Sequence, residues 1–307
     1  MTGSGGALVS IGLDIGATKV HGVAVDGNGE IVAEHRTATE AGPEGVVRSA
    51  AAVVDTLAAA LGMTASAAPI GVGVPGLVDP KHGAVKHAVN LGLEGDWFPI
   101  GDRLADRLGT SVLVENDVNA ATLGAHQLAG VDDVAYVSLG TGLAAGMVLD
   151  GHLRRGFHGA AGEIGHLPVD PRGPLCSCGQ RGCLELVASG RALAAAWPSS
   201  EQPPAQALFA AAADGDPAAI ATRDRFTEGV AAAVRLIALS TDPRIVVIGG
   251  GVAALGEPLR AAVSEALTRQ AVGSAFLASL DLPGRLRIVP PGVPVAALGA
   301  ATLGRAR

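Results

Sequence analysis

Apolar runs separated by glycine-bearing turns open the sequence. The runs at 7–13, 20–25 and 30–35 are each the length of a single strand, and the turns at 14–18 and 26–29 divide them. This alternation predicts an antiparallel meander of three strands.

Helices and strands alternate after the meander. Helical periodicity, a buried apolar run, a shorter helical stretch and another apolar run follow at 46–61, 70–74, 100–108 and 111–114. Such alternation is typical of an α/β domain.

The second half repeats the pattern of the first. Laying Asp14 on Ser138 places Gly16 on Gly140, and the same offset aligns the Asp-Gly turns that follow. Further elements are expected at 135–139, 144–149, 217–239, 244–248, 255–270, 286–289 and 295–305. The repeat suggests two α/β domains that face each other across a cleft. We expect an N-terminal domain at 1–117 and a C-terminal domain at 118–294, with 295–307 packing back on the first.

Composition describes the expected core. Of the 307 residues, 49% are hydrophobic but only 3% are aromatic, so the core must pack with small and branched side chains. The 29 acidic residues outnumber the 22 basic ones, which gives a net charge of -7. This charge repels a phosphate backbone and argues against nucleic acid as a partner.

The mean hydropathy of +0.39 raises the alternative of a membrane protein. Glycine, proline and charged residues interrupt every apolar stretch, so none reaches the roughly 20 residues of a membrane span. The first residues also lack the basic head and apolar middle of a secretory signal. We therefore expect a protein of the cytoplasm.

Three glycine turns, at 14–19, 140–142 and 249–251, are candidate phosphate-binding sites. Glycine lets backbone N–H groups approach an anion, Thr18 adds a hydroxyl donor, and Asp14 can hold a hydrated Mg²⁺. For the first turn alone, an ordinary hairpin is an equal alternative. A second such turn from an opposing domain favours a grip on a polyphosphate. None of the three is a Walker loop, because the Gly-Lys-Ser/Thr ending is missing.

Asn116-Asp117 follows an apolar strand and opens an Ala-rich helix. A carboxylate at this strand end is a candidate base for a hydroxyl that attacks a phosphoryl group. The alternative is a plain helix N-cap, for which Asn and Asp are preferred residues. The two roles are compatible.

All three cysteines of the chain lie between 176 and 183, ten residues beyond His166. Cys176, Cys178, Cys183 and His166 match the Cys3His set of a structural Zn²⁺ site, and the glycines among them permit a tight loop. Free thiols beside a surface histidine are the alternative. A closed set of four ligands would shape the loop and leave the chemistry to other residues. Glu163 and Glu185 flank this zinc knuckle, and paired carboxylates with a histidine suggest a polyol or sugar ligand.

Five motifs occur in a fixed order: Asp14-x-Gly16-x-Thr18, Glu115-Asn116-Asp117-x-Asn119-Ala120-Ala121, Gly140-Thr141-Gly142, Gly162-Glu163-x-Gly165-His166 and Cys176-x-Cys178-Gly179-x-x-Gly182-Cys183-x-Glu185. From about residue 8 to 305 the chain resembles the ROK family of repressors and sugar kinases. The resemblance implies the actin/hexokinase-like (ribonuclease H-like) fold, with two α/β domains flanking a nucleotide cleft.

The resemblance also implies roles by position. Asp117 would take the proton from the 6-hydroxyl of a hexose. The sugar would be bound by residues of both halves, namely Gly76, Asn90, Asn116, Asp117, Glu163, His166 and Glu185. ATP and Mg²⁺ would be bound at the glycine turns, by Asp14, Gly16, Thr18, Lys19, Gly140, Thr141, Gly142, Gly249 and Gly250. Zn²⁺ would be bound by His166, Cys176, Cys178 and Cys183.

The expected activity is ATP-dependent phosphorylation of a hexose, with glucose first and N-acetylmannosamine or N-acetylglucosamine as alternatives. The loop at 94–96 is longer than in typical glucokinases, so the sugar stays open. A sugar-sensing regulator without catalysis is the alternative from another class. Repressors of the family carry a winged helix-turn-helix ahead of the first motif, and Asp14 comes too early in this sequence for one. A homodimer or homotetramer would be ordinary for the family, with no membrane partner.

Overall fold

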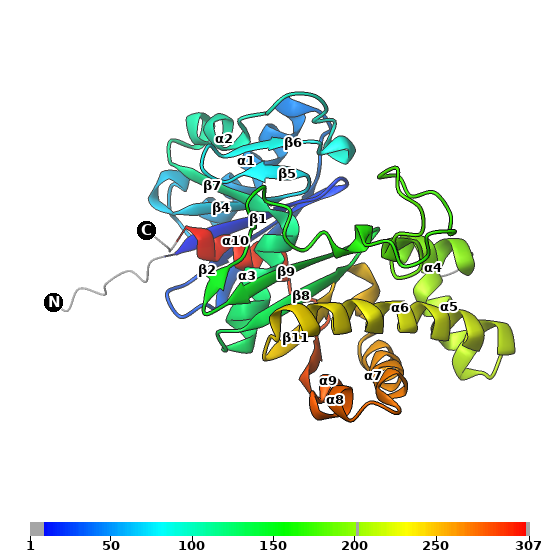
Figure 1. Ribbon diagram of the computed structural model, residues 1–307. Helices are drawn as coiled ribbons and strands as arrows, with labels where there is room; N and C mark the ends of the chain where they lie inside the picture. The colour runs from blue at the N-terminus through cyan, green and yellow to red at the C-terminus, as the bar shows by residue number, and fades with distance from the viewer. Residues whose placement is uncertain (1–8, 201–202, 305–307) are drawn as a thin grey trace. The chain divides into compact units, whose positions relative to one another are not determined.

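The computed structural model describes residues 9–200 and 203–304 (Figure 1). The chain forms two compact units. The first unit takes 1–130, 155–160 and 294–307, and the second takes 131–154 and 161–293. The termini of the predicted first domain, 1–8 and 305–307, lie outside the described residues.

The first unit is built on a five-stranded mixed sheet in the order β3-β2-β1-β4-β7. Its first three strands pair antiparallel, and β4 and β7 continue in parallel from β1. These strands are β1 (Ser10–Ile15), β2 (Lys19–Val25), β3 (Ile31–Ala38), β4 (Ile70–Val74) and β7 (Val112–Asn116). The predicted meander is therefore confirmed.

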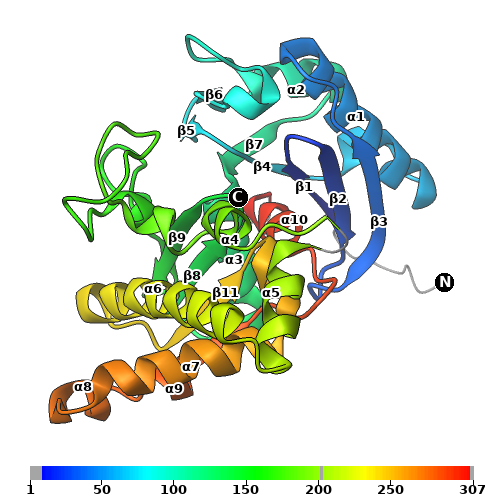
Figure 2. The ribbon, with the colours of Figure 1, turned by 90° about the vertical axis from the view of Figure 1, so that its right-hand side faces the viewer.

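Helices cover both faces of this sheet. Successive residues of a strand point to opposite faces, so each strand contacts helices on both sides. Ile11, Leu13 and Ile15 of β1 share one buried cluster with the apolar side of α1 (Pro43–Ala60). The intervening Gly12 faces α10 (Val295–Leu303) on the other side. In Figures 1 and 2, α10 lies beside α3 (Asp117–Ala129), which it also contacts.

Glycine permits the close packing of α10. A Cβ on Gly12 would lie 2.0 Å from the Ala297 carbonyl oxygen, and one on Gly71 would lie 1.9 Å from that of Ala300. A Cβ on Gly299 would lie 1.8 Å from the Ala120 carbonyl oxygen of α3. Backbone therefore packs on backbone with no room for a side chain. This is the small-residue core that the composition predicted.

The position of α3 differs from the predicted domain boundary at 117. The helix belongs to the first unit, because its backbone is packed against α10 and the sheet. The sequence shows where α3 begins, but the contacts that assign it to a unit come from α10, far along the chain.

The remaining elements of the first unit are short or peripheral. They are α2 (Ile100–Leu108), the hairpin of β5 (Leu77–Asp79) and β6 (Ala84–Lys86), and the 3-10 helices η1 (Ala65–Ala67) and η2 (Val89–Leu91). The hairpin and the 3-10 helices are not predicted by the sequence pattern, since each is three residues long.

The second unit repeats the sheet of the first. Its order is β10-β9-β8-β11-β12, with β8, β9 and β10 antiparallel and β11 and β12 parallel to β8. The strands are β8 (Val134–Leu139), β9 (Leu143–Leu149), β10 (His152–Leu153), β11 (Ile245–Gly249) and β12 (Leu286–Ile288). Asp14 and Ser138 hold the same place in β1 and β8, so the internal repeat inferred from the sequence is a repeat of structure.

Helices α6 (Pro217–Thr241) and α7 (Glu257–Ala271) pack side by side in the second unit, as both ribbon views show. The other helical segments are α4 (Gly190–Ala196), α5 (Pro204–Ala213), α8 (Ala275–Ser279), α9 (Leu282–Arg285), η3 (Ile164–His166), η4 (Leu184–Leu186) and η5 (Gly251–Leu255). A loop joins α4 to α5, which begins at Pro204, and residues 201–202 of this loop lie outside the described part.

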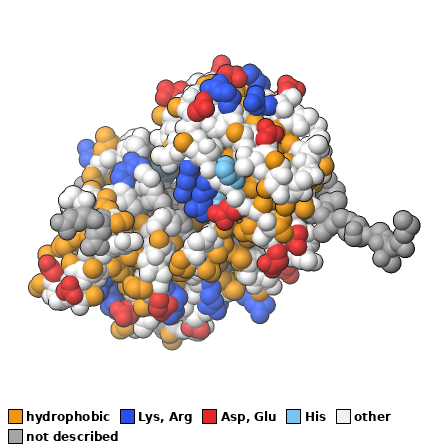
Figure 3. Space-filling model, turned by 180° about the vertical axis from the view of Figure 1, so that it is seen from behind, with side chains coloured by type: hydrophobic (Ala, Val, Ile, Leu, Met, Phe, Trp, Pro, Cys, Tyr) orange, Lys and Arg blue, Asp and Glu red, His pale blue; other side chains and the backbone are white. Residues whose placement is uncertain are grey.

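Across the described residues, every helix is too short or too polar to cross a bilayer. On the face that Figure 3 shows, basic and acidic side chains lie among one another.

Candidate active site

The turn from β1 to β2 presents polar groups to solvent. The Gly16 N–H donates to the Lys19 carbonyl at 2.9 Å, and the Thr39 hydroxyl donates to the Gly16 carbonyl at 2.7 Å. These bonds close the turn and leave Thr18 and Lys19 exposed. A hydroxyl donor and an ammonium group therefore stand beside the half-buried Asp14, as a phosphate site requires.

Asp14 is electrostatically coupled to Asp117. Desolvation by the surrounding protein, and then the negative charge of Asp117, raise the pKa of Asp14 from its ordinary value to about 6, although Lys19 opposes the shift. Gly73 of β4 allows this approach, since a Cβ there would lie 3.0 Å from the Ala120 Cβ and 3.6 Å from the Asp117 Cα. A carboxyl group whose pKa is raised by a neighbouring carboxylate marks a place where a divalent cation would be stabilising.

Asn116 provides the N-cap of α3. Its side-chain oxygen accepts from the N–H groups of Val118 and Asn119, and its amide nitrogen donates to the Gly76 carbonyl at 3.1 Å. The capping alternative is thus correct for Asn116, while Asp117 is the first residue of the helix and is half-buried. The cap fixes the backbone from which the Asp117 carboxylate extends.

A cavity of about 480 Å³ lies beside Asn116 within the first unit. Its wall includes the β5–β6 hairpin, Trp97, Arg155 and Phe157. The Lys86 ammonium stands 4.8 Å from the centre of the Trp97 ring, and Phe157 is 95% exposed. A cavity with the side-chain amides of Asn116 and Asn119, carboxylates, cations and exposed aromatic rings suits a small polar ligand with apolar faces.

Of the two remaining predicted sugar ligands of the first unit, Gly76 contacts this region through its hydrogen bond with Asn116. A Cβ on Gly76, whose φ is 101°, would lie 2.7 Å from the Lys86 carbonyl oxygen, so only glycine fits there. Asn90 lies on η2 with its side chain exposed.

The second unit carries the turn from β8 to β9. The Gly140 carbonyl accepts from the Gly190 N–H at 2.8 Å, and the Thr141 carbonyl accepts from the Arg191 N–H at 3.3 Å. A Cβ on Gly250, whose φ is 84°, would lie 2.6 Å from the Leu139 backbone. The structure therefore brings two of the three predicted glycine turns together.

Gly249 is the last residue of β11 and packs against the Tyr136 side chain. A Cβ on Gly249 would lie 2.2 Å from the Tyr136 hydroxyl. After Gly142 the residues Leu143, Ala144 and Ala145 form the start of β9, with Leu143 and Ala145 buried.

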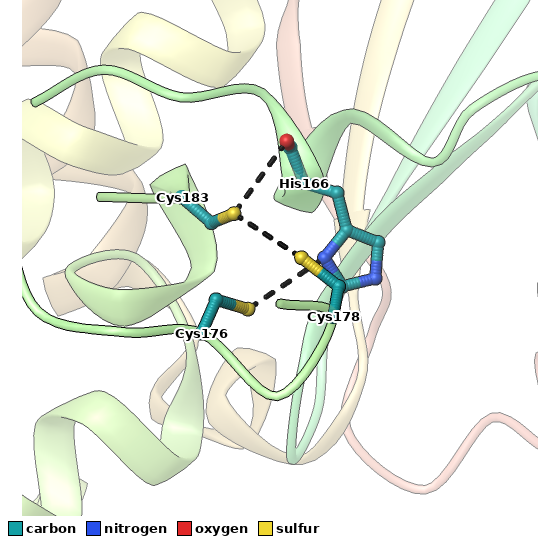
Figure 4. Close-up of side chains that lie close together, drawn as sticks. All are labelled: His166, Cys176, Cys178 and Cys183. Atoms are coloured by element: carbon teal, nitrogen blue, oxygen red, sulfur yellow. Dashed lines mark hydrogen bonds between the residues drawn. The ribbon is translucent and has the colours of Figure 1, made fainter. Parts of the chain in front are cut away.

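Four predicted metal ligands converge in the second unit. The thiols of Cys176, Cys178 and Cys183 and the His166 ring point toward one another in Figure 4, and their ligand atoms lie within 4.8 Å of one another. The Cys178 and Cys183 sulfurs are 3.6 Å apart. Two sulfurs on one tetrahedral Zn²⁺ would be about 3.8 Å apart, given Zn–S bonds of about 2.3 Å. The donor set and its spacing fit Zn²⁺.

The pKa values of two of the three thiols are shifted in opposite directions. A hydrogen bond from the Gln180 backbone lowers the pKa of the Cys178 thiol to about 6, whereas desolvation raises that of Cys183 to about 12. A metal ion would favour the thiolate form of both groups.

His166 joins this cluster to both predicted sugar-binding carboxylates. Its Nδ1 lies 3.9 Å from the Cys176 sulfur and 3.7 Å from Glu185 Oε1, and its Nε2 lies 3.9 Å from Glu163 Oε2. The Cys176 thiol also donates to Glu185 Oε1 at 3.1 Å. The His166 imidazole therefore lies close to both Glu163 and Glu185, and the prediction that the two carboxylates flank the knuckle agrees with this placement.

Glu185 also lies against the glycine turn. A Cβ on Gly142 would lie 3.1 Å from Glu185 Oε2. The predicted phosphate turn and the predicted sugar ligand are thus in contact within the second unit.

The model of the ROK family matches residues 10–303. The chain belongs to the ROK family. A glucokinase from Thermotoga maritima is 36% identical over 292 residues, with 86% of this chain and 90% of the relative covered. An N-acetylmannosamine kinase from Citrobacter koseri is 34% identical over 250 residues, with 79% of this chain and 83% of the relative covered.

Solved structures share the fold of this ROK protein. The ROK family glucokinase from Streptomyces griseus, in complex with glucose and AMPPNP, has a TM-score of 0.79 and 33% sequence identity, with 97% of this chain and 99% of the other covered. The α/β fold with two mixed five-stranded sheets agrees with this likeness.

Two further residues of this ROK protein belong to the site and received no role from sequence alone. Glu115 is 1% exposed and accepts from Arg155 Nε at 2.6 Å. Glu115 stands inside a predicted motif, but its partner is 40 residues away. No local pattern links the two.

Proposed function

We propose that this ROK protein is an ATP-dependent hexose kinase that phosphorylates the 6-hydroxyl, with glucose as the first candidate and N-acetylmannosamine or N-acetylglucosamine as alternatives. The observation that carries the proposal is the Asp14–Asp117 pair beside an exposed Thr18-Lys19 turn, next to a cavity at Asn116. The names of the kinase relatives support it.

Each polar group has a role in this proposal. Asp117 would accept the proton of the 6-hydroxyl as it attacks the γ-phosphoryl group, and Asn116, Glu163 and Glu185 would bind other hydroxyls. Asp14 and the backbone N–H groups of the glycine turns would hold Mg²⁺ and the phosphates of ATP, whose charge they stabilise in the transition state. Zn²⁺, when bound, supplies structural support to the loop at 166–183.

The experiment is an ADP-release assay over hexoses and N-acetylhexosamines. We expect turnover with at least one of them, and the ranking identifies the sugar. A chain that binds a sugar in calorimetry but releases no ADP would be a sensor, and the kinase proposal would then be wrong.

Asp117→Asn tests the base within the same assay. We expect kcat to fall by roughly 10² to 10⁴, the range for a general base, with sugar binding largely kept. The exposed Asp106→Asn is the matched control in the same unit. Wild-type turnover by Asp117→Asn would remove this residue from the mechanism.

A further inference from the structure

Glu115 is a buried carboxylate with a complete set of donors. Arg155 Nε donates to Oε2 at 2.6 Å, while the Asn116 N–H and the Asn119 side-chain amide each donate to Oε1 at 3.0 Å. The Glu115 side chain is 2% exposed and that of Arg155 is 40% exposed. A buried carboxylate without a countercharge is strongly disfavoured, and the Arg155 guanidinium supplies that countercharge to Glu115.

The two amides that Glu115 binds bracket Asp117. One belongs to the residue before Asp117, and the other to the residue two positions after it. Asn116 in turn caps α3 and reaches Gly76. The backbone at Asp117 is thereby held from both sides by contacts that converge on one carboxylate.

Arg155 enters the first unit from an unusual place in the chain. It begins the segment 155–160, which belongs to the first unit although the second unit supplies the residues on both sides. Its neighbour Arg154 instead donates to the Leu149 carbonyl and to Asp150 Oδ2, each at 3.1 Å, inside the second unit. Adjacent arginines therefore serve different units, and Arg154 is a matched control.

We propose that Arg155 is a positioning residue for phosphoryl transfer: it holds the Glu115 carboxylate in place, and through Asn116 and Asn119 that carboxylate fixes the position of Asp117. This inference rests on the proposed function. A base displaced by about 1 Å can lose roughly a hundredfold in rate, so Arg155 acts on kcat more than on sugar affinity.

The test measures kcat and the sugar KM of Arg155→Ala, Arg155→Lys and Arg154→Ala on the best sugar of the wild-type chain. We expect Arg155→Ala to lower kcat by about ten- to a hundredfold with KM changed by less than about threefold. Arg155→Lys keeps the charge but not the guanidinium geometry, so its kcat should be intermediate. Arg154→Ala should match the wild type.

Chemical rescue separates positioning from folding. Because the Arg155 side chain is partly exposed, free guanidinium at millimolar concentrations can reach the space left in Arg155→Ala and should raise its kcat in a saturable way. It should leave the wild type and Arg154→Ala unchanged. If Arg155→Ala fails to fold, kcat and the sugar KM are measured instead for two other variants. These are Arg155→Lys and the double variant Glu115→Gln/Arg155→Ala, in which no unpaired carboxylate charge is left.

Three outcomes would overturn the inference. These are a kcat of Arg155→Ala within twofold of the wild type, a loss confined to the sugar KM, and a lowered kcat that guanidinium does not raise. A wild-type chain without turnover on any sugar would overturn the proposed function, and this inference with it. In the other cases the wild type turns over, so only the inference fails.

Discussion

The first and second units carry the same sheet with different chemistry at its first turn. In the first unit, β1 holds Asp14 and the following turn ends in Lys19. In the second unit, Ser138 stands in place of Asp14, and Leu143 stands in place of Lys19. The repeated scaffold thus provides two glycine turns, of which one is charged and the other neutral.

The second unit places charge beside its turn by another route. Glu185 follows the knuckle in the chain and lies against Gly142, with His166 and Cys176 beside its carboxylate. The comparison teaches that the strand order sets where a turn lies, while residues outside the repeat decide what the turn can bind. Variants in both units test this view, beginning with the largest expected effect.

Asp14→Asn should separate function from stability. We expect kcat to fall by roughly a hundredfold or more, because a charge aimed at Mg²⁺ and the phosphates is lost. The same change should raise the free energy of unfolding at pH 7.5 by about 1–2 kcal/mol. The reason is that a pKa of about 6 means that folding disfavours the ionised form of Asp14, which is the form present at this pH.

The pH dependence of Asp14 has a definite sign. The folded state binds its proton more tightly than the unfolded state, whose pKa is near 3.8, so wild-type stability falls as pH rises from about 4 through about 6. Urea unfolding should show the advantage of Asp14→Asn at pH 7.5 and little of it below pH 4. The exposed Asp55→Asn should show neither effect. Equal stability of Asp14→Asn and wild type at pH 7.5 would contradict the assignment.

Cys176→Ser tests the proposed zinc site of the second unit. We expect bound zinc to be lost in metal analysis and sugar affinity to fall by about ten- to a hundredfold, because His166 and Glu185 lose their common anchor. Ser177→Ala, between two ligands, is the control. A purified wild-type protein without zinc, or a Cys176→Ser variant with unchanged sugar affinity, would show that the knuckle does not order this site.

Gly142→Ala should distinguish the two turns. The new Cβ would press on Glu185 Oε2, so we expect the sugar KM to rise about two- to tenfold, the scale of one weakened hydrogen bond. Gly16→Ala is the matching variant in the first unit, where the nearest atom is the Lys19 carbonyl oxygen at 3.3 Å. It should raise the ATP KM instead. If both variants raise the same KM, the two turns do not bind different ligands, and the prediction is wrong.

Trp97→Ala should have the smallest effect, on the choice of sugar. Trp97 forms part of the cavity wall at Asn116 and holds Lys86. We expect the ratio of kcat/KM for glucose and N-acetylmannosamine to change by less than about tenfold, with overall turnover kept. An unchanged ratio would place sugar selection elsewhere.

The sequence predicted much of this architecture for a clear reason. Long or strongly patterned elements, such as β4, α2 and α6, reflect local hydrophobic periodicity and turn residues. The zinc knuckle could be predicted from the sequence as well, because its four proposed ligands lie close together in the chain. They are His166, Cys176, Cys178 and Cys183. Short elements such as the β5–β6 hairpin were not predicted, since three residues carry too little pattern.

By itself, the sequence determined the repeated α/β halves, the small-residue core and the groups that we propose to bind phosphate, sugar and zinc, because these depend on local order along the chain. Only the tertiary structure decided that α3 belongs with α10, that Gly142 touches Glu185, and that Arg155 neutralises Glu115. Each of these contacts joins residues that are distant in sequence or lie on different elements. Burial and close backbone packing select such contacts, and neither is visible before the chain is folded.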